Sequence, residues 1–320
     1  MEKEKNIDIT EEFSSFLLKK GRKASTIKRY IYDVKHFIYW LEKSNKTSYQ
    51  VNDLLTVHPN EFEDYFNSLR LNLHYSDKTI YRIYSVLNQF YQHLDIYNPL
   101  ENINITQPDR SLRAEDFISD EEETKLKDTL YSLNGLTKRQ HSVRPMLMDR
   151  NASIINLLLN YGLSLQELVS LQMKHIHFEN NTLSVPEVGS IKRTIQLTEE
   201  DKDKLYKYHK NIPTPVRPKY HSCNPLFIAF DFIRGTYRWS YENDAPKGLT
   251  EISIQKMIKL EVARSELRKG ISAKHLRNTF IIRLIENNTP EDTIMKQMGF
   301  KSKLSLKRYS QYVENKNKHQ

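Results

Sequence analysis

Hydrophobic residues recur at helical spacing through the first third of the chain. Within the second of four such segments, isoleucine, tyrosine, valine and phenylalanine return every three or four positions, with lysine and arginine between them. A stripe of this kind is buried when a helix packs against its neighbours. We therefore predict a four-helix module, with helices over about residues 9–19, 24–43, 51–71 and 76–94.

A polar segment follows this module. Residues 106–117 contain Pro108 and show no hydrophobic period, which is typical of a linker between domains. Ser119 and Glu122 then form a capping-box pattern, which marks a helix start. We therefore divide the chain into a first domain over residues 1–105, a linker over 106–117 and a second domain over 118–320.

The second domain combines helical patterns with one hairpin. Alternating residues at 182–185 and 194–197, with Gly189-Ser190 between them, predict the two strands. Residues 135–144 are basic and polar, and we expect a loop there. Because the chain has only 8 glycines and 11 prolines, it should be mainly α with a small β-sheet. The longer helices of this domain are expected over about residues 119–133, 149–161 and 252–269, with three shorter ones after residue 273.

The stretch from residue 211 to 255 has no clear period. Tyr237, Trp239 and Tyr241 alternate within it. They could form a strand, a loop packed on the core, or a surface on which nucleic acid bases stack, and the pattern leaves these three readings open.

Charge and cysteine content narrow the class of protein. Lysine and arginine total 49 against 40 acidic residues, a net charge of +9 that favours a polyanionic partner. Cys223 is the only cysteine, so neither a disulfide within the chain nor a cysteine-based zinc site is possible. No apolar run reaches transmembrane length and no signal peptide opens the sequence, so we expect a cytoplasmic protein without a membrane partner.

The candidate chemistry lies near the C-terminal end. Lys274, His275 and Arg277 crowd the start of a helical pattern, and Tyr309 follows on a later helix. An arginine can bind two phosphate oxygens in a fork, and a nearby phenol can attack phosphorus. The arrangement suits the handling of a phosphodiester.

This segment resembles the C-terminal catalytic boxes of the tyrosine recombinases, the phage integrase family. The family pattern is His-x-x-Arg-His-Thr-Phe, then Leu-Gly-His, then a nucleophilic tyrosine. Thr279-Phe280 and Met298-Gly299 match its constant pairs, Arg277 matches its arginine and Tyr309 its nucleophile. The two family histidines that flank these motifs are here Lys274 and Phe300.

A second stretch resembles the family's Thr-Gly-Leu-Arg box and the hairpin after it. Gly162-Leu163 and Glu167-Leu168 match, but Ser164 stands at the first catalytic arginine and Val188 at the hairpin lysine. Lys192 and Arg193 are close by on the same hairpin and could shift into the lysine position, but Arg193 has its own match in the family pattern.

The resemblance covers about residues 7–314 and implies the tyrosine-recombinase architecture. The first module is then the core-binding domain, of SAM-like type, and the second the catalytic-like domain. The basic residues expected to contact double-stranded DNA are Lys28, Arg29, Lys78, Arg82, Lys192, Arg193, Lys274, His275 and Arg277.

The substitutions also suggest a function. Of the six catalytic positions only Arg277 and Tyr309 keep the family residue, and losing one electrostatic donor slows catalysis by roughly 10²–10³-fold. We therefore expect a sequence-specific DNA-binding protein without recombinase activity, used as a transcriptional repressor in a temperate phage or prophage. The alternatives are an active, divergent recombinase in which Lys192 and Lys274 replace the lost groups, and an accessory architectural factor. No cofactor or metal is expected, and the protein should act as a monomer or weak dimer on DNA.

Overall fold

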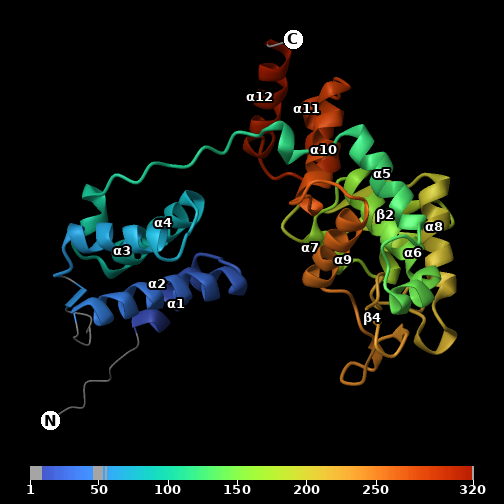
Figure 1. Cartoon of the computed structure of the whole chain (residues 1–320), viewed down its shortest axis with the longest axis horizontal. Helices are drawn as coiled ribbons and strands as arrows, with labels where there is room; N and C mark the ends of the chain where they lie inside the picture. Colours follow the sequence, from blue (N-terminus) through green and yellow to red (C-terminus); the bar gives the residue numbers. More distant parts are fainter. Residues whose placement is uncertain (1–8, 46–52, 55, 319–320) are drawn as a thin grey trace. The chain divides into compact units, whose positions relative to one another are not determined.

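A computed structural model describes residues 9–45, 53–54 and 56–318 and divides the chain into two compact units. The first unit covers residues 1–110 and the second 111–320 (Figure 1). Each has its own hydrophobic core, because the two main clusters of buried side chains draw on separate stretches of sequence. No helix within the described ranges is both long and apolar enough to span a membrane.

The described residues of the first unit form four α-helices. Its centre is aromatic: the rings of Phe37 and Phe62 stack at 4.6 Å, and Tyr65 meets Phe37 edge-on at 5.0 Å. All three side chains are fully buried. The helices are α1 (Ile9–Lys19), α2 (Ala24–Asn45), α3 (Pro59–Leu71) and α4 (Asp77–Leu94), followed by a 3₁₀ turn, η2 (Pro99–Asn102).

The helix predicted over residues 51–71 begins later than the hydrophobic pattern suggested. His58 caps α3 and Pro59 occupies its first turn, where a missing N–H costs nothing. Part of that prediction, residues 51, 52 and 55, lies outside the described residues.

An ion pair joins α2 to α4. The carboxylate of Asp33 is 2% exposed, and both terminal nitrogens of Arg82 donate to it, one at 3.2 Å. Arg29, on the outer side of α2, lies 3.6 Å from the same carboxylate. Arg82 therefore neutralises a buried charge at a helix–helix contact.

The second unit packs its helices around α6. This helix touches α5, α8 and α10, and nearly every side chain from Arg150 to Leu159 is buried. The helices are α5 (Asp120–Tyr131), α6 (Lys138–Leu159), α7 (Leu165–Ser170), α8 (Glu199–Asn211), α9 (Glu251–Arg264), α10 (Ala273–Glu286), α11 (Glu291–Met298) and α12 (Leu304–Lys318), with short 3₁₀ turns at η3 (Ala114–Asp116), η4 (Met173–His175) and η5 (Thr214–Val216).

The loop predicted over residues 135–144 is wrong for most of its length. Thr137 caps α6 and exchanges hydrogen bonds with Gln140, so the helix starts at Lys138. Its first turns are polar because they lie at the surface. These residues therefore show no hydrophobic period from which a helix could be predicted. Pro145 lies within α6, where the sequence pattern gave no sign of a continuing helix.

The strands form one three-stranded antiparallel sheet and two small ribbons. The predicted hairpin is present, with Leu183 opposite Ile195 and Val185 opposite Arg193. The strands are β1 (Ile176–His177), β2 (Thr182–Val185), β3 (Arg193–Gln196), β4 (Phe230–Asp231), β5 (Thr236–Tyr237), β6 (Trp239–Ser240) and β7 (Ala245–Pro246), paired in the orders β1-β2-β3, β4-β5 and β6-β7. The mainly helical fold with a small sheet is thereby confirmed.

The three alternating aromatic residues do not share one environment. Tyr237 is buried against Phe230, with ring centres 5.1 Å apart, and its hydroxyl donates to the Met146 carbonyl. Trp239 is half-buried in β6, and Tyr241 is 89% exposed. The core interpretation therefore holds for Tyr237 alone.

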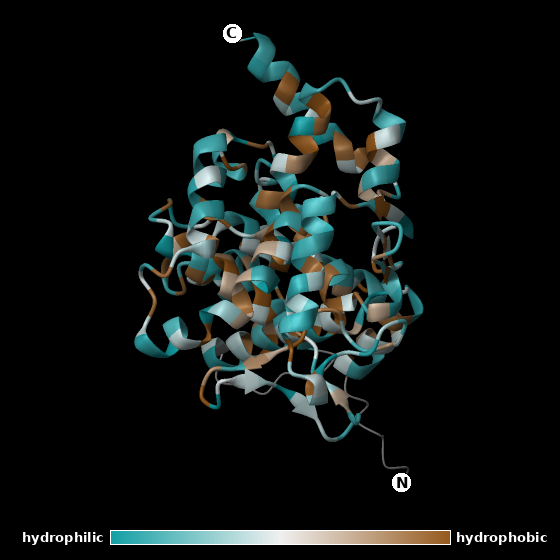
Figure 2. Cartoon of the chain, turned by 90° about the vertical axis from the view of Figure 1, so that its right-hand side faces the viewer, coloured by the Kyte–Doolittle hydropathy of each residue, from teal (hydrophilic) through white to brown (hydrophobic). Residues whose placement is uncertain are grey.

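The last helices form a smaller cluster of their own. Ile281 of α10, Met298 of α11 and Tyr309 of α12 are buried together with Leu112 and Phe117 from the start of the unit. Along α12 the residues change from hydrophobic, where the helix meets this cluster, to hydrophilic at the C-terminal end (Figure 2).

The Arg82–Asp33 pair generates a stability prediction. Arg82→Met removes the partner of a buried carboxylate and should lower the free energy of unfolding by about 2 kcal/mol. Urea unfolding of the full chain measures this. Arg70→Met is the matched control, because Arg70 pairs at 3.4 Å with the exposed Asp77 and should change little. An unchanged midpoint together with weaker DNA binding would instead support Arg82 as a DNA contact.

Candidate functional site

The site is centred on Glu167, whose side chain is fully buried in the first turn of α7. Its carboxylate accepts the backbone N–H of Ser164 at 2.7 Å, the Ser190 hydroxyl at 2.5 Å and a terminal nitrogen of Arg193. Burial alone would raise the pKa of Glu167, but the hydrogen bond and charge of Arg193, with these other donors, lower it to about 2. The group is therefore a fixed negative charge at neutral pH.

Arg277 faces this carboxylate from α10. Its guanidinium donates to Glu167 at 3.2 Å, to the Met298 carbonyl at 3.3 Å and to the Gly162 carbonyl. Burial lowers the pKa of Arg277, and Glu167 opposes that shift. The Phe300 ring lies beside the guanidinium, with its centre 5.6 Å away. Arg277 is thus positioned by the protein, with 17% of its side chain still exposed.

Tyr309 lies in the contact between α10 and α12. Its hydroxyl donates to the Asn278 side chain at 2.8 Å and accepts from Arg308 at 2.7 Å. The side chain is 3% exposed, although it is close enough to Arg277 to act on it electrostatically. The structure therefore brings the predicted arginine and tyrosine into one neighbourhood but covers the tyrosine.

The glycines of the two matched boxes allow close packing here. Gly162 has φ +64°, and a Cβ there would lie 2.5 Å from the Phe280 ring. Gly299 has φ +63°, and a Cβ there would lie 2.8 Å from the Ile191 carbonyl. The backbone of Gly299 also accepts the Ile191 N–H at 2.9 Å, which ties the hairpin loop to the end of α11.

The hairpin residues differ from their predicted roles. The side chain of Arg193 is 6% exposed and bound to Glu167, so the structure gives it an internal ion pair, and its expected contact with DNA stays a prediction. Lys192 is exposed on the same loop. Val188 precedes the loop glycine and has no polar group to offer. Ser164, at the position of the family arginine, caps α7.

The start of α10 is less cationic than its sequence suggested. Lys274 is half exposed and lies 3.7 Å from Asp116. The Nδ1 atom of His275 accepts the Ser272 N–H at 3.2 Å, and burial, together with Arg268, lowers its pKa. His275 is therefore a neutral helix cap at pH 7, and its expected contact with DNA stays a prediction for an uncharged ring.

The basic residues of the first unit also fall into two groups, those that are exposed and one that is held in an internal ion pair. Lys28, Arg29 and Lys78 are exposed, so they stay available as predicted DNA contacts. Arg82 belongs to the same predicted set, but its guanidinium pairs with the buried Asp33, so its contact with DNA stays a prediction that the Arg82→Met variant tests.

Three side chains of the site were missed from the sequence as functional candidates. Glu167 was matched to the family only as part of a motif, and its buried position and capping pattern with Ser164 were the available signals. Asn278 and Arg308 adjoin Arg277 and Tyr309 in sequence, and that adjacency was their only signal.

The low pKa of Glu167 generates a prediction about pH. Since the folded value of about 2 lies below the usual 4.5, the group stabilises the fold above pH 4.5 and loses this effect as pH falls toward 2. Glu167→Gln should therefore cost about 3 kcal/mol of unfolding free energy at pH 7. The difference in unfolding free energy between Glu167→Gln and the natural chain should become smaller below pH 4.5. The control is Glu187→Gln, an exposed residue 3.5 Å from Lys301, which should cost little at any pH. A difference in unfolding free energy that does not vary with pH would contradict the low pKa of Glu167 in the folded chain.

The sequence matches two families of known domains. Residues 140–316 match the phage integrase family, and residues 9–95 match the phage integrase N-terminal SAM-like domain. The tyrosine recombinase XerC of Pediococcus pentosaceus is 24% identical over 91% of this chain and 88% of its own length. XerD of Listeria innocua is also 24% identical, over 91% of this chain and 90% of its own length.

Solved structures share the fold. The Tn1549 transposon integrase in complex with transposon right end DNA has a TM-score of 0.66 and 17% identity, covering 95% of this chain and 94% of that one. The XerH site-specific recombinase bound to difH substrate has a TM-score of 0.64 and 16% identity, covering 93% and 81%. The predicted tyrosine-recombinase architecture is confirmed.

One expectation is contradicted. The substituted catalytic positions predict a protein that is not an enzyme, yet the relatives that match nine-tenths of the chain are named tyrosine recombinases, which are enzymes. The substituted positions at Ser164, Val188, Lys274 and Phe300 are therefore not grounds for inactivity. Since more than half of the sequence matches the family, the chain belongs to the phage integrase family, the tyrosine recombinases.

Proposed function

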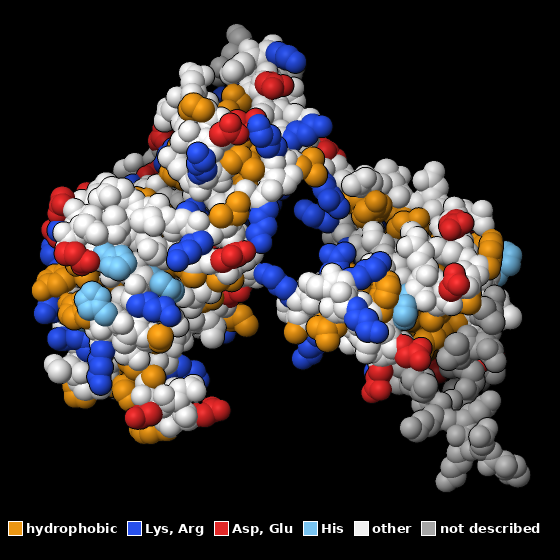
Figure 3. All heavy atoms as spheres, turned by 180° about the vertical axis from the view of Figure 1, so that it is seen from behind, with side chains coloured by type: hydrophobic (Ala, Val, Ile, Leu, Met, Phe, Trp, Pro, Cys, Tyr) orange, Lys and Arg blue, Asp and Glu red, His pale blue; other side chains and the backbone are white. Residues whose placement is uncertain are grey.

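We propose that this chain binds a specific sequence in double-stranded DNA and that both units contact it. The transposon integrase and XerH structures of the same fold hold DNA, and the net charge of +9 suits a polyanion. Lysine and arginine side chains are spread over the visible face of each unit (Figure 3). In the first unit Lys28 and Lys78, near the starts of α2 and α4, are free to reach a groove or a phosphate.

The observation that carries this proposal is the fixed position of Arg277. Glu167 and two backbone carbonyls hold its guanidinium, and 17% of the side chain remains exposed. An arginine oriented in advance loses little freedom when it binds a phosphate oxygen. Its place in the first turns of α10 adds the favourable dipole of a helix start. Such a contact positions the protein on DNA without reading the bases.

This generates a prediction about salt dependence. Arg277→Ala should weaken binding to specific and unrelated DNA by similar factors and lower the slope of log affinity against log salt by about one unit. Fluorescence anisotropy titrations at several salt concentrations, well below the melting temperature, measure the slope. The matched control is Arg283→Ala on the same helix, because Asp120 at 2.7 Å and Glu123 already offset its charge. Equal slopes for natural chain and Arg277→Ala would make Arg277 purely structural.

The use of this binding that we favour is control of transcription. A protein that occupies an operator can exclude RNA polymerase, and this requires only binding, which the exposed cations and Arg277 support. A repressor role in a prophage would follow from occupancy of sites upstream of phage genes. Mapping of bound DNA in the host, with transcript levels after deletion of the gene, tests this. Bound sites without any change in neighbouring transcripts would exclude it.

A second candidate is DNA strand cleavage, which the names of the relatives and the proximity of Arg277 and Tyr309 favour. The phenol oxygen would form a bond to phosphorus as the bond from phosphorus to the 5′ oxygen breaks. The phenol proton must leave, and the 5′ oxygen must gain one. Lys192, on the hairpin, and Lys274, at the start of α10, are exposed lysines that could supply or accept these protons. Because Tyr309 is 3% exposed, α12 would have to move before the phenol reached DNA.

Cleavage has its own test. If Tyr309 attacks DNA, a denaturing gel should show a covalent species with a nicked suicide substrate, and Tyr309→Phe should abolish it. DNA affinity should change less than about threefold in that variant, because it removes only a hydroxyl bonded to Asn278 and Arg308. Absence of the species at saturating protein would count against cleavage and leave the binding proposal standing.

A further inference from the structure

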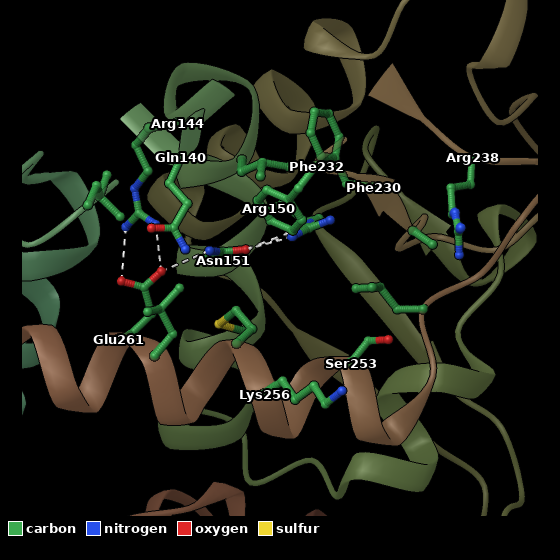
Figure 4. Close-up of a pocket in the computed structure, with 16 residues that line it drawn as sticks. Gln140, Arg144, Arg150, Asn151, Phe230, Phe232, Arg238, Ser253, Lys256 and Glu261 are labelled. Carbon is green, nitrogen blue, oxygen red and sulfur yellow. Dashed lines mark hydrogen bonds and ion pairs between the residues drawn. The ribbon is translucent and has the colours of Figure 1, made fainter. Parts of the chain in front are cut away.

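The second unit contains a cavity of about 270 Å³ that neither proposed use of the protein requires. It lies between α6, α9 and the segment from Ala229 to Arg238 (Figure 4). Pockets for small molecules usually measure about 300–1,000 Å³ and combine apolar walls with a few convergent polar groups. At about 270 Å³ this cavity is slightly smaller than that range. Its apolar wall includes Leu147, Phe230, Leu249, Met257 and Leu260.

Arg150 supplies the central polar group. Its side chain is 4% exposed and donates to the Ile228 carbonyl at 3.2 Å and to the Asn151 side chain at 3.1 Å. Among the residues that the structure describes, no carboxylate lies within 4 Å of its guanidinium. A buried charge is costly without an opposite charge beside it. An anion in the cavity would provide that charge.

The one carboxylate in the lining is already engaged. Glu261 is fully buried and pairs with Arg144 at 2.5 Å and also with Arg264, so two arginines offset its charge. The Nε atom of Arg144 is buried and finds no partner among the described groups. The charge of Glu261 is thus already neutralised, so the positive charge of Arg150 and the Nε–H donor of Arg144 remain without a partner of opposite character among the described residues of the cavity.

Two further cations stand where the cavity opens. Arg238 and Lys256 are exposed and line it, and Figure 4 shows Arg150 near the centre of the view, with Arg238 to its right and Lys256 below it on α9. Arg238 lies 3.7 Å from Asp231, which offsets it in part. Ser253, beside Lys256 on α9, adds a hydroxyl. Four cations and one carboxylate thus line the cavity, an excess that favours an anionic ligand.

The occupant is small, because Arg150 lies inside the unit and is almost closed to solvent. A phosphate of duplex DNA is fixed to a wide backbone and cannot enter such a space. We propose that the cavity binds a small organic anion, a carboxylate or phosphate ester with an apolar or aromatic body. Its charged group would meet Arg150 and Arg238, and its body would pack on Phe230, Leu249 and Met257.

The test uses the full chain and two probes, benzoate and phenyl phosphate, which separate the two head groups. At least one should bind saturably in isothermal titration calorimetry and raise the melting temperature. Benzyl alcohol, which lacks the charge, and inorganic phosphate, which lacks the body, should bind at least about tenfold more weakly. The proposal would be overturned if neither probe binds. It would also be overturned if benzyl alcohol binds as tightly as benzoate and inorganic phosphate binds as tightly as phenyl phosphate.

Variants locate the binding. Arg150→Gln should weaken the better probe about tenfold or more, and Lys256→Gln about threefold. Lys259→Gln is the matched control, since Lys259 is exposed on the same helix but does not line the cavity. If Arg150→Gln does not fold, Lys256→Gln and Arg238→Gln still decide the question. Equal affinity in Lys256→Gln, Arg238→Gln and Lys259→Gln would place any binding elsewhere and overturn the assignment.

Discussion

The carboxylate of Glu167 is removed from water and receives donors from four separate segments of the second unit. They are the start of α7 through Ser164, the hairpin loop through Ser190, β3 through Arg193 and α10 through Arg277. Removing such a charge from water costs several kcal/mol unless its partners stay in place. The orientation of Arg277, and with it the candidate phosphate contact, therefore depends on a group that itself never meets DNA.

The first unit repeats this principle on a smaller scale. Asp33 is buried between α2 and α4, and Arg82 spans the two helices to reach it. In both units an arginine that could have faced DNA instead completes an internal ion pair. Which basic residues remain available is therefore decided by the acidic residues that the fold buries beside them, and the surface left for DNA follows from the packing of the core.

Local patterns explain which parts of the structure the sequence could predict. The stripes of α2 and α4 and the alternation in β2 and β3 arise within a single element, so short windows of sequence contain them. The start of α6 could not be predicted in this way, because its first turns are polar. The burial of Arg82 and Arg193 depends on carboxylates 49 and 26 residues away in the sequence. The proximity of Arg277 to Tyr309 came from the family pattern, and their bonds to Glu167 and Asn278 did not.

The small cluster around Tyr309 also determines how long the connection between the units is. Leu112 and Phe117 belong to that cluster, and the Phe117 ring lies 4.7 Å from that of Tyr312 on α12. A displacement of α12 would remove part of the surface that anchors residues 111–117 and would lengthen the free tether. The local concentration of one unit near DNA held by the other falls as a flexible tether grows beyond the span it must cover. If both units bind DNA as proposed, a state of α12 that exposes the Tyr309 phenol would also lengthen the connection between the units and lower the avidity of the whole protein.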